Sequence, residues 1–300
     1  MLAGGEIHRH DKWAAGIASR GATRFQKRLE REYDASMSRE PPQQHEPFEV
    51  SRRVWSDPTC MLLVFVGSSA EFPLNPAVDW LFYTGRLPSD PLARFLETVA
   101  WLRRLIVADE ETRNRDAKKL KKLHKVLEQK RGDTIPALSY RDVLCMNMIY
   151  SIRSVPLVTG KELELSEKDA MVRDLSLTGQ QMGIQDLPWT WEQLCQQRRE
   201  RIKKWVRNDY TSKLLDSYRQ ALGPLNYEVL ISGFPMLVED EILERLGTGK
   251  RWLSSPMKLS MAPLCRTGLC HLVYRILLPS KVKSTVLNWS KTTQACPMGK

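Results

Sequence analysis

The sequence predicts an all-α protein. Segments with helix-capping residues follow one another through most of the 300 residues, and short polar turns separate them. Strand signals are few and unpaired, and no internal repeat is visible. With 42% hydrophobic and 27% charged residues, the composition is that of an ordinary globular chain. These observations favour one helical domain over residues 51–280.

Both ends of the chain are expected to differ from this domain. Residues 1–50 are polar and contain a Pro-Pro loop, which predicts a partly disordered N-terminal arm, and residues 281–300 have no hydrophobic period and are expected to form a flexible tail. No apolar run approaches the ~20 residues that a membrane-spanning helix needs, and no signal peptide is recognisable. Six scattered cysteines suit reduced thiols, so we expect a cytoplasmic protein.

The first expected helix begins at Asp57 and Pro58, which form a typical helix start, and ends at Gly67. The β-branched residues of this segment would also allow a strand. A short helix is expected next at 76–84, with Gly85 as its terminator.

Two longer helices follow at 91–107 and 110–130. Asp90 is placed to cap the first of them, and Pro91 fits its first turn, where the missing N–H costs nothing. The second is rich in lysine, and its basic run at 118–125 is interpreted as the solvated face of an amphipathic helix.

Five more helices are expected in the second half of the domain. One opens near Ser139 and is predicted to kink or end before Pro156. The next is capped by Ser166, with Asp169 completing a box-like start, and closes at Gly183.

The last helices of the domain are expected after Thr190, which is a typical N-cap residue, and at 213–222 and 239–246. Gly247 would stop the final one. The later segment 268–283 alternates basic and apolar residues, so it suits either a packed terminal helix or a helix lying on a membrane surface.

Arg94, Thr98 and His124 are the candidate functional residues. Arg94 and Thr98 are four residues apart and therefore share a helix face. His124 lies among three leucines that predict a buried stripe: Leu120, Leu123 and Leu127. A buried imidazole needs a partner for each nitrogen, and iron is one such partner. An isolated histidine on an apolar face is more often a core residue hydrogen-bonded to a carbonyl, so both interpretations stay open.

The order of features between Val54 and Asn208 resembles the catalytic domain shared by rubber oxygenases (latex-clearing proteins) and the fungal ER-bound oxygenase of mycophenolate biosynthesis. The matching pieces are VWSDP at 54–58, NPAVDWLFYTGRLPSDPLARFLET at 75–98, LKKLHKVL at 120–127 and LTGQQMGIQDLPWTWEQL at 177–194. No piece is specific by itself, and the resemblance rests on their order and spacing.

The resemblance implies a helical bundle with a globin-like core around one haem b, and O₂-dependent oxidation of a hydrophobic substrate such as an isoprenoid. His124 would be the proximal iron ligand, with Arg94 and Thr98 near the haem. Two residues depart from the family pattern: Glu97 stands where rubber oxygenases have lysine, and Asn75 replaces the histidine of their His-Pro-Ala-Val segment. Glu97 would be placed to act as a base beside the distal pocket.

Two other functions are compatible with the sequence. A helical protein that kept this fold and lost its chemistry would explain the two departures. The formal net charge of +11 suits a basic adaptor at an anionic surface, such as the ER membrane or a nucleic acid. Nucleic acid is the less favoured partner, because the basic residues are spread over many segments without an interleaved aromatic pattern.

Overall fold

The computed structural model describes residues 45–82, 85–248, 251–269 and 283, within a chain that divides into two units at 1–44 and 45–300. Most of the expected N-terminal arm, most of the expected tail and most of the amphipathic segment 268–283 therefore lie outside the described residues. Phe48 and Val50 are buried in the core, so residues 45–50 belong to the helical unit.

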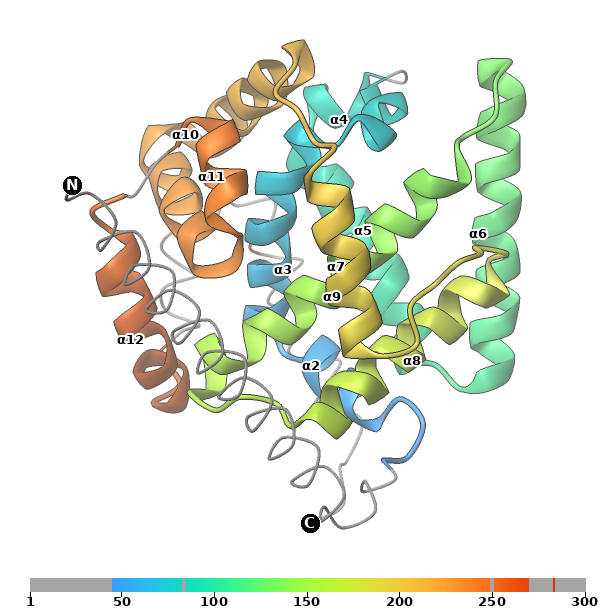
Figure 1. Ribbon diagram of the computed structural model, residues 1–300, viewed down its shortest axis with the longest axis horizontal. Coiled ribbons are helices and arrows are strands. Elements are labelled where there is room, and N and C mark those ends of the chain that lie inside the picture. The colour runs from blue at the N-terminus through green and yellow to red at the C-terminus, as the bar shows by residue number, and fades with distance from the viewer. Residues whose placement is uncertain (1–44, 83–84, 249–250, 270–282, 284–300) are drawn as a thin grey trace, which may run out of the picture. The chain divides into compact units, whose positions relative to one another are not determined.

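The described part of the chain is helical and contains no strand, which confirms the predicted all-α bundle (Figure 1). Its helices are α2 (Glu49–Ser56), α3 (Pro58–Glu71), α4 (Arg86–Ser89), α5 (Pro91–Val107), α6 (Glu110–Arg131), α7 (Ala137–Thr159), α8 (Leu165–Gln181), α9 (Trp191–Ile202), α10 (Asp209–Leu237), α11 (Asp240–Leu246) and α12 (Ser254–Arg266), with two 3-10 helices, η1 (Phe72–Leu74) and η2 (Pro76–Phe82).

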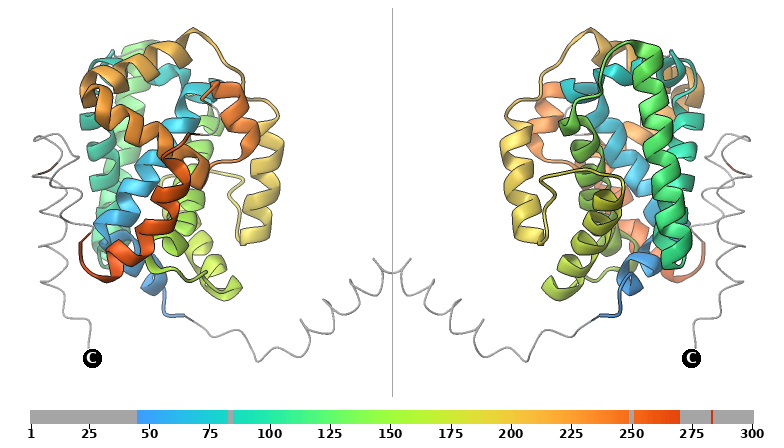
Figure 2. Two further views of the ribbon diagram at one scale, coloured as in Figure 1. Left: turned by 90° about the vertical axis from the view of Figure 1, so that its left-hand side faces the viewer. Right: turned by 90° about the vertical axis from the view of Figure 1, so that its right-hand side faces the viewer.

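Helices α3 and α7 form the centre of this bundle. They pack against each other, and α10 packs against α3, while α6 lies at the edge of the unit and contacts α5 and α8 (Figures 1 and 2). Met61, Met148 and Phe234, from these three central helices, are at most 1% exposed. Burying each such side chain stabilises the fold by about 1.5–3 kcal/mol relative to leaving it in water.

Gly67 does not end α3, contrary to the sequence prediction, because the helix continues to Glu71. The ring of Tyr150 on α7 lies directly over Gly67, and a Cβ atom at this position would overlap it. The glycine is therefore needed for close contact between two central helices, a role that local sequence signals do not distinguish from helix termination.

Pro156 also fails to end its helix, since α7 continues to Thr159 and closes at Gly160 with a φ of 71°. The proline removes only one backbone donor, the one that would reach the carbonyl four residues earlier. Val155 and Leu157 on either side of it are buried, so packing holds the last turn in place.

The helix starts were predicted well where a side chain caps a free backbone N–H. The caps at Asp57, Asp90 and Thr190 are all confirmed, and Thr190 Oγ1 accepts from the backbone N–H of Gln193 at 3.2 Å. Gly247 ends α11, as predicted.

Two other boundaries were wrong. The capping box of α8 uses Glu164 and Glu167, two residues before the predicted pair. Helix α10 is much longer than the predicted 213–222, because it begins after the Asn208 cap and resumes beyond a break at Gly223.

Among the described residues, no single helix is both long and apolar enough to cross a bilayer. One bent pair, residues 58–74 and 76–82 joined at 97°, meets the criteria of length and composition together. Cys60, Cys145 and Cys195 are free thiols, whereas Cys265 is disulfide-bonded, so the expected reduced state does not extend to that residue.

Candidate functional site

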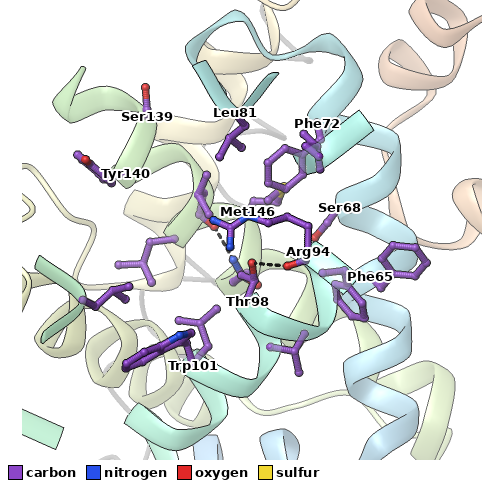
Figure 3. A pocket seen from close by; sticks show the side chains of 18 of the residues that line it. Phe65, Ser68, Phe72, Leu81, Arg94, Thr98, Trp101, Ser139, Tyr140 and Met146 are labelled. Carbon is purple, nitrogen blue, oxygen red and sulfur yellow. Dashed lines mark hydrogen bonds between the residues drawn. The ribbon is translucent and has the colours of Figure 1, made fainter. Parts of the chain in front are cut away.

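A cavity of about 150 Å³ lies between α3, α5, α6 and α7 (Figure 3). Its walls are mostly apolar, with aromatic and methionine side chains that include Phe65, Phe72, Trp80, Phe95, Trp101, Tyr140, Met146 and Met182. Arg94, Thr98 and His124 also line it, so the fold brings the three predicted residues to one cavity. This arrangement, a hydrophobic chamber with a few polar groups, is typical of small-molecule sites.

Arg94 and Thr98 reach the cavity from the first turns of α5. The Asp90 cap fixes this end of the helix, since its carboxylate accepts from Ala93 N at 3.0 Å. Thr98 Oγ1 donates to the carbonyl of Arg94 at 3.0 Å (Figure 3), which leaves the oxygen lone pairs of this hydroxyl as acceptors. Arg94 Nη1 lies 3.2 Å from Glu97 Oε2, so the guanidinium already has one anionic partner.

His124 approaches the cavity from α6 and is half-buried. Burial lowers the pKa of its imidazole from 6.5 to about 4; the positive charge of Arg94 acts in the same direction and Glu128 opposes it. The ring is therefore neutral at neutral pH, the form that can donate a lone pair to a metal. No hydrogen bond joins it to another residue in the described part of the chain.

Tyr140 and Glu128 surround the imidazole, and sequence reasoning missed both. The centroid of the Tyr140 ring is 4.7 Å from that of His124. Glu128 Oε1 accepts from the backbone N–H of Ile135 at 2.9 Å and lies 3.4 Å from the Tyr140 hydroxyl. Glu128 is four residues after His124 on one helix face, a spacing that would have identified it, whereas Tyr140 is brought there by the turn between α6 and α7.

Glu97 and Asn75, the two departures from the family pattern, do not line the cavity. The Glu97 side chain is 42% exposed and lies beside Arg94. Asn75 is buried, donates to Asp142 Oδ2 at 3.1 Å and accepts from Ala77 N at 3.0 Å. Its side chain holds the start of η2 in place.

The prediction that Leu123 belongs to a buried stripe was wrong, because its side chain is 53% exposed. The inward stripe of α6 instead runs through Arg113, Ala117, Leu120 and His124, at the three- and four-residue steps of an α-helix. Leu123 lies about 100° away from His124 around the helix axis and points out of the bundle.

The donor groups suit an iron porphyrin better than a bare ion. The described residues contain no group of three or more His, Cys, Asp or Glu placed to hold a metal, whereas haem iron needs only one axial protein ligand. A neutral His124, apolar walls and the cation of Arg94, which could pair with a haem carboxylate, fit that group. The cavity volume of about 150 Å³ is below the roughly 300–1,000 Å³ of typical ligand sites, so holding a porphyrin would require the lining side chains to move.

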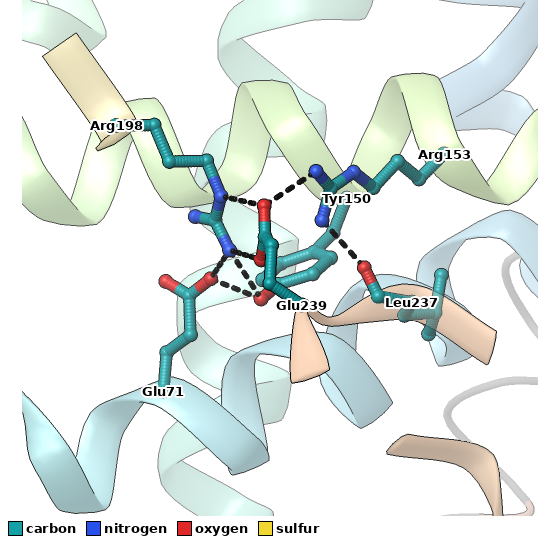
Figure 4. Close-up of polar contacts among 6 residues, drawn as sticks. All are labelled: Glu71, Tyr150, Arg153, Arg198, Leu237 and Glu239. Carbon is teal, nitrogen blue, oxygen red and sulfur yellow. Dashed lines mark hydrogen bonds and ion pairs between the residues drawn. The ribbon is translucent and has the colours of Figure 1, made fainter. Parts of the chain in front are cut away.

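A second polar cluster lies deeper in the bundle and is fully paired (Figure 4). Arg198 contacts Glu71, the Tyr150 hydroxyl and Glu239, with 2.7 Å between Arg198 Nη2 and Glu239 Oε2. Arg153 adds a 2.6 Å contact to Glu239 Oε1. Two cations therefore balance two carboxylates, and together they link α3, α7 and α9 to the start of α11. The sequence carried no local signal for this cluster.

The carboxyl groups of this cluster respond differently to their surroundings. Burial alone would raise the pKa of Glu239, but hydrogen bonds from Arg198 and Arg153 outweigh it and lower the pKa to about 2. For the wholly buried Glu71, burial dominates over the attraction of Arg198 and raises the pKa. The cluster fastens helices together and offers no open position to a ligand.

Comparison with known families identifies the domain. The family model described as "ER-bound oxygenase mpaB/B'/Rubber oxygenase, catalytic domain" matches residues 52–286, which is most of the chain. No curated protein and no solved structure gives a significant match. The chain therefore belongs to this family, as the resemblance in the sequence indicated, and the match extends beyond the stretch that carried the resemblance.

Proposed function

Starting from this family membership, we propose that the protein is an oxygenase-type oxidoreductase that holds a haem b in the α5–α6–α7 cavity and oxidises a hydrophobic small molecule with O₂. The observation that carries the proposal is a neutral imidazole, His124, that faces an apolar cavity together with a cation, Arg94. When bound, the haem supplies the oxygen chemistry, and the protein supplies binding and orientation.

His124 is the proposed iron ligand. Its low pKa keeps a nitrogen lone pair available at neutral pH, and no competing hydrogen bond from another described residue has to be broken. The Tyr140 ring, held beside it by Glu128, restricts the orientation of the imidazole. A ligating histidine is commonly oriented by a hydrogen bond from its other ring nitrogen, and here the ring contact with Tyr140 would take over that positioning.

Arg94 would pair with a haem carboxylate and Thr98 would hydrogen-bond near the distal face. Arginine suits a carboxylate because its planar N–H groups match both oxygens. The aromatic and methionine walls exclude water and accept an apolar substrate, for which the family resemblance favours the isoprenoid class. Arg94 also pairs with Glu97, so the guanidinium would have two anionic partners. Glu97 would act as a base only from a position on the distal side of the haem.

Reconstitution of the purified protein with haem tests this proposal. We expect a Soret band for the wild type, its loss or shift in His124→Ala, and its recovery when free imidazole fills the space left by the side chain. His45→Ala is the matched control, because His45 lies outside the cavity beside Glu49 and should leave the spectrum unchanged. A wild-type protein that binds no haem, or a Soret band that is the same in His124→Ala as in the wild type, would overturn the proposal.

The pairing of Arg94 with Glu97 favours one alternative, a member that kept the fold and lost the oxygenase reaction. The measurement is O₂ consumption by the haem-loaded protein with a panel of hydrophobic substrates. Consumption by the wild type supports the oxygenase. Consumption only by Glu97→Lys, which restores the lysine of the resemblance, supports the alternative.

A further inference from the structure

The outer face of α6 has an unusual composition for a solvated helix. Residues 117–127 contain five lysines and no acidic residue. All five are exposed: Lys118, Lys119, Lys121, Lys122 and Lys125. Lys118, Lys122 and Lys125 form no ion pair with another residue in the part of the chain that the structure describes, so their charge is not neutralised locally.

Two aliphatic side chains lie among these lysines. Leu123 is 53% exposed and Val126 is 46% exposed. Leu123 is one helical turn from Lys119, and Val126 is one turn from Lys122, so apolar and cationic groups share the outer surface. A helix that faced only water would gain nothing from exposing them, whereas a helix at a lipid surface would bury them.

The same helix forms a wall of the cavity. Leu120 and His124 point inward from α6 and line the cavity, while the lysine-rich face lies on the other side of the helix. Helix α6 is at the edge of the unit, where a flat surface could approach it along its length (Figures 1 and 2).

We propose that this outer face of α6 docks on a bilayer that contains anionic lipid. The lysines would contact the acidic headgroups, and Leu123 and Val126 would enter the interfacial layer. Each lysine near such a surface strengthens binding about fivefold. Docking in this way would also let an apolar substrate dissolved in the bilayer reach the cavity beside the helix that touches the membrane. This role in substrate entry rests on the proposed function.

Two alternatives fit less well: a nucleic acid as the partner of α6, and a docking surface at α12. A nucleic acid would use the lysines but not the two aliphatic side chains, and no aromatic side chain lies between residues 117 and 127 for base stacking. Trp252, two residues before α12, and Leu259, within α12, are 78% and 82% exposed and make α12 another candidate surface, far from α6 in the view of Figure 1. That surface lacks a comparable lysine run.

Co-sedimentation of the full-length protein with vesicles tests the docking face. We expect binding to phosphatidylcholine vesicles that contain phosphatidylserine, weak binding to pure phosphatidylcholine, and weakening as salt rises. The triple variant Lys118→Gln, Lys122→Gln, Lys125→Gln should bind about 100-fold more weakly at low salt. Leu123→Ser with Val126→Ser should weaken binding several-fold at unchanged charge.

A matched control loses the same charge elsewhere. It carries Lys203→Gln, Lys204→Gln and Lys213→Gln, all at exposed positions outside α6. This control variant should bind nearly as well as the wild type. Circular dichroism confirms that each variant is folded. Unchanged binding by both α6 variants overturns the proposal, as does loss of binding on Trp252→Ala with Leu259→Ala instead.

A nucleic-acid role is separated by the same set of variants. Binding to duplex DNA that is tighter than binding to vesicles, sensitive to the lysines and indifferent to Leu123 and Val126, would also overturn the proposal. Vesicle binding is measured without added haem and again after reconstitution. A protein that binds vesicles through α6 but takes up no haem therefore refutes the proposed function and leaves the docking face standing.

Discussion

The cavity and the buried cluster around Arg198 are two polar sites in one bundle, and they differ in how completely their polar groups are paired. Arg198 is 8% exposed and contacts two carboxylates and a phenol. At the cavity, His124 has no hydrogen bond to another described residue, and Arg94 keeps one ion pair at a partly exposed position. One site is closed by its own residues, and the other has bonding capacity left for a ligand.

The difference separates structural from functional polar groups. Buried polar atoms that satisfy one another stabilise and specify a fold, and removing one partner exposes the cost of burying the rest. Polar groups that face an apolar cavity without full pairing make a site available at little structural cost. The substitutions below should therefore change stability at the first site and ligand chemistry at the second.

The largest effect is expected for Arg198→Met. The substitution leaves the wholly buried Glu71 and the partly buried Glu239 without their main cation, so we expect a loss of about 3–5 kcal/mol in the free energy of unfolding. Arg199→Met, at the exposed neighbouring position, should cost less than about 0.5 kcal/mol. Urea denaturation measures both, and equal effects would show that the cluster does not fasten the bundle.

The pH dependence of stability should distinguish the two sites. The folded-state pKa of His124 is about 4, below its ordinary 6.5, so the unfolded chain binds more protons between these values. Stability attributable to His124 is therefore lost as pH falls below 6.5, by up to about 3 kcal/mol near pH 4. For Glu239, with a folded-state pKa of about 2, stability is present above pH 4.5 and is lost as pH falls towards 2.

Unfolding of haem-free wild type and His124→Gln in urea at pH 7 and pH 4.5 checks the first window. The free energy of unfolding of His124→Gln should rise relative to that of the wild type at low pH, because the variant has no imidazole to protonate. A constant difference would mean that His124 is as readily protonated in the folded protein as in water.

A smaller loss, about 1–3 kcal/mol, is expected for Gly67→Ala. The new methyl group would overlap the Tyr150 ring, which the Arg198 cluster holds in place. In a Tyr150→Ala background the same substitution should cost nothing or stabilise, since alanine is the better helix former. Thermal unfolding of the four proteins gives the coupling, and additive effects would contradict the contact.

The smallest effect is expected for Arg94 substitutions, which should change the pKa of His124. Arg94→Met should raise the pKa of His124, because the cation that opposes imidazole protonation is removed. Arg94→Lys keeps the positive charge, so the pKa of His124 should stay closer to its wild-type value. An NMR titration of the His124 ring follows both, and an unchanged pKa in Arg94→Met would show that burial alone sets it.

Much of the fold could be predicted because its signals are local. The start of α5 at Pro91 was predicted from the Asp90 cap, and the end of α11 was predicted from Gly247. Arg94 and Thr98 were placed together by helical spacing alone. Glycine and proline misled the prediction inside α3 and α7, because each carries the same local signal whether it ends a helix or only allows a neighbour to pack.

The sequence by itself determined the helical class, most helix starts and the shared face of Arg94 and Thr98, since caps and periodicity act within a few residues. Only the tertiary structure decided that His124 joins them at one cavity, that Tyr140 lies against its ring, and that Leu123 points outward. It also decided that Glu71, Arg198 and Glu239 meet. These contacts join residues far apart in the chain, and they depend on how whole helices pack rather than on any property of the segments that supply them.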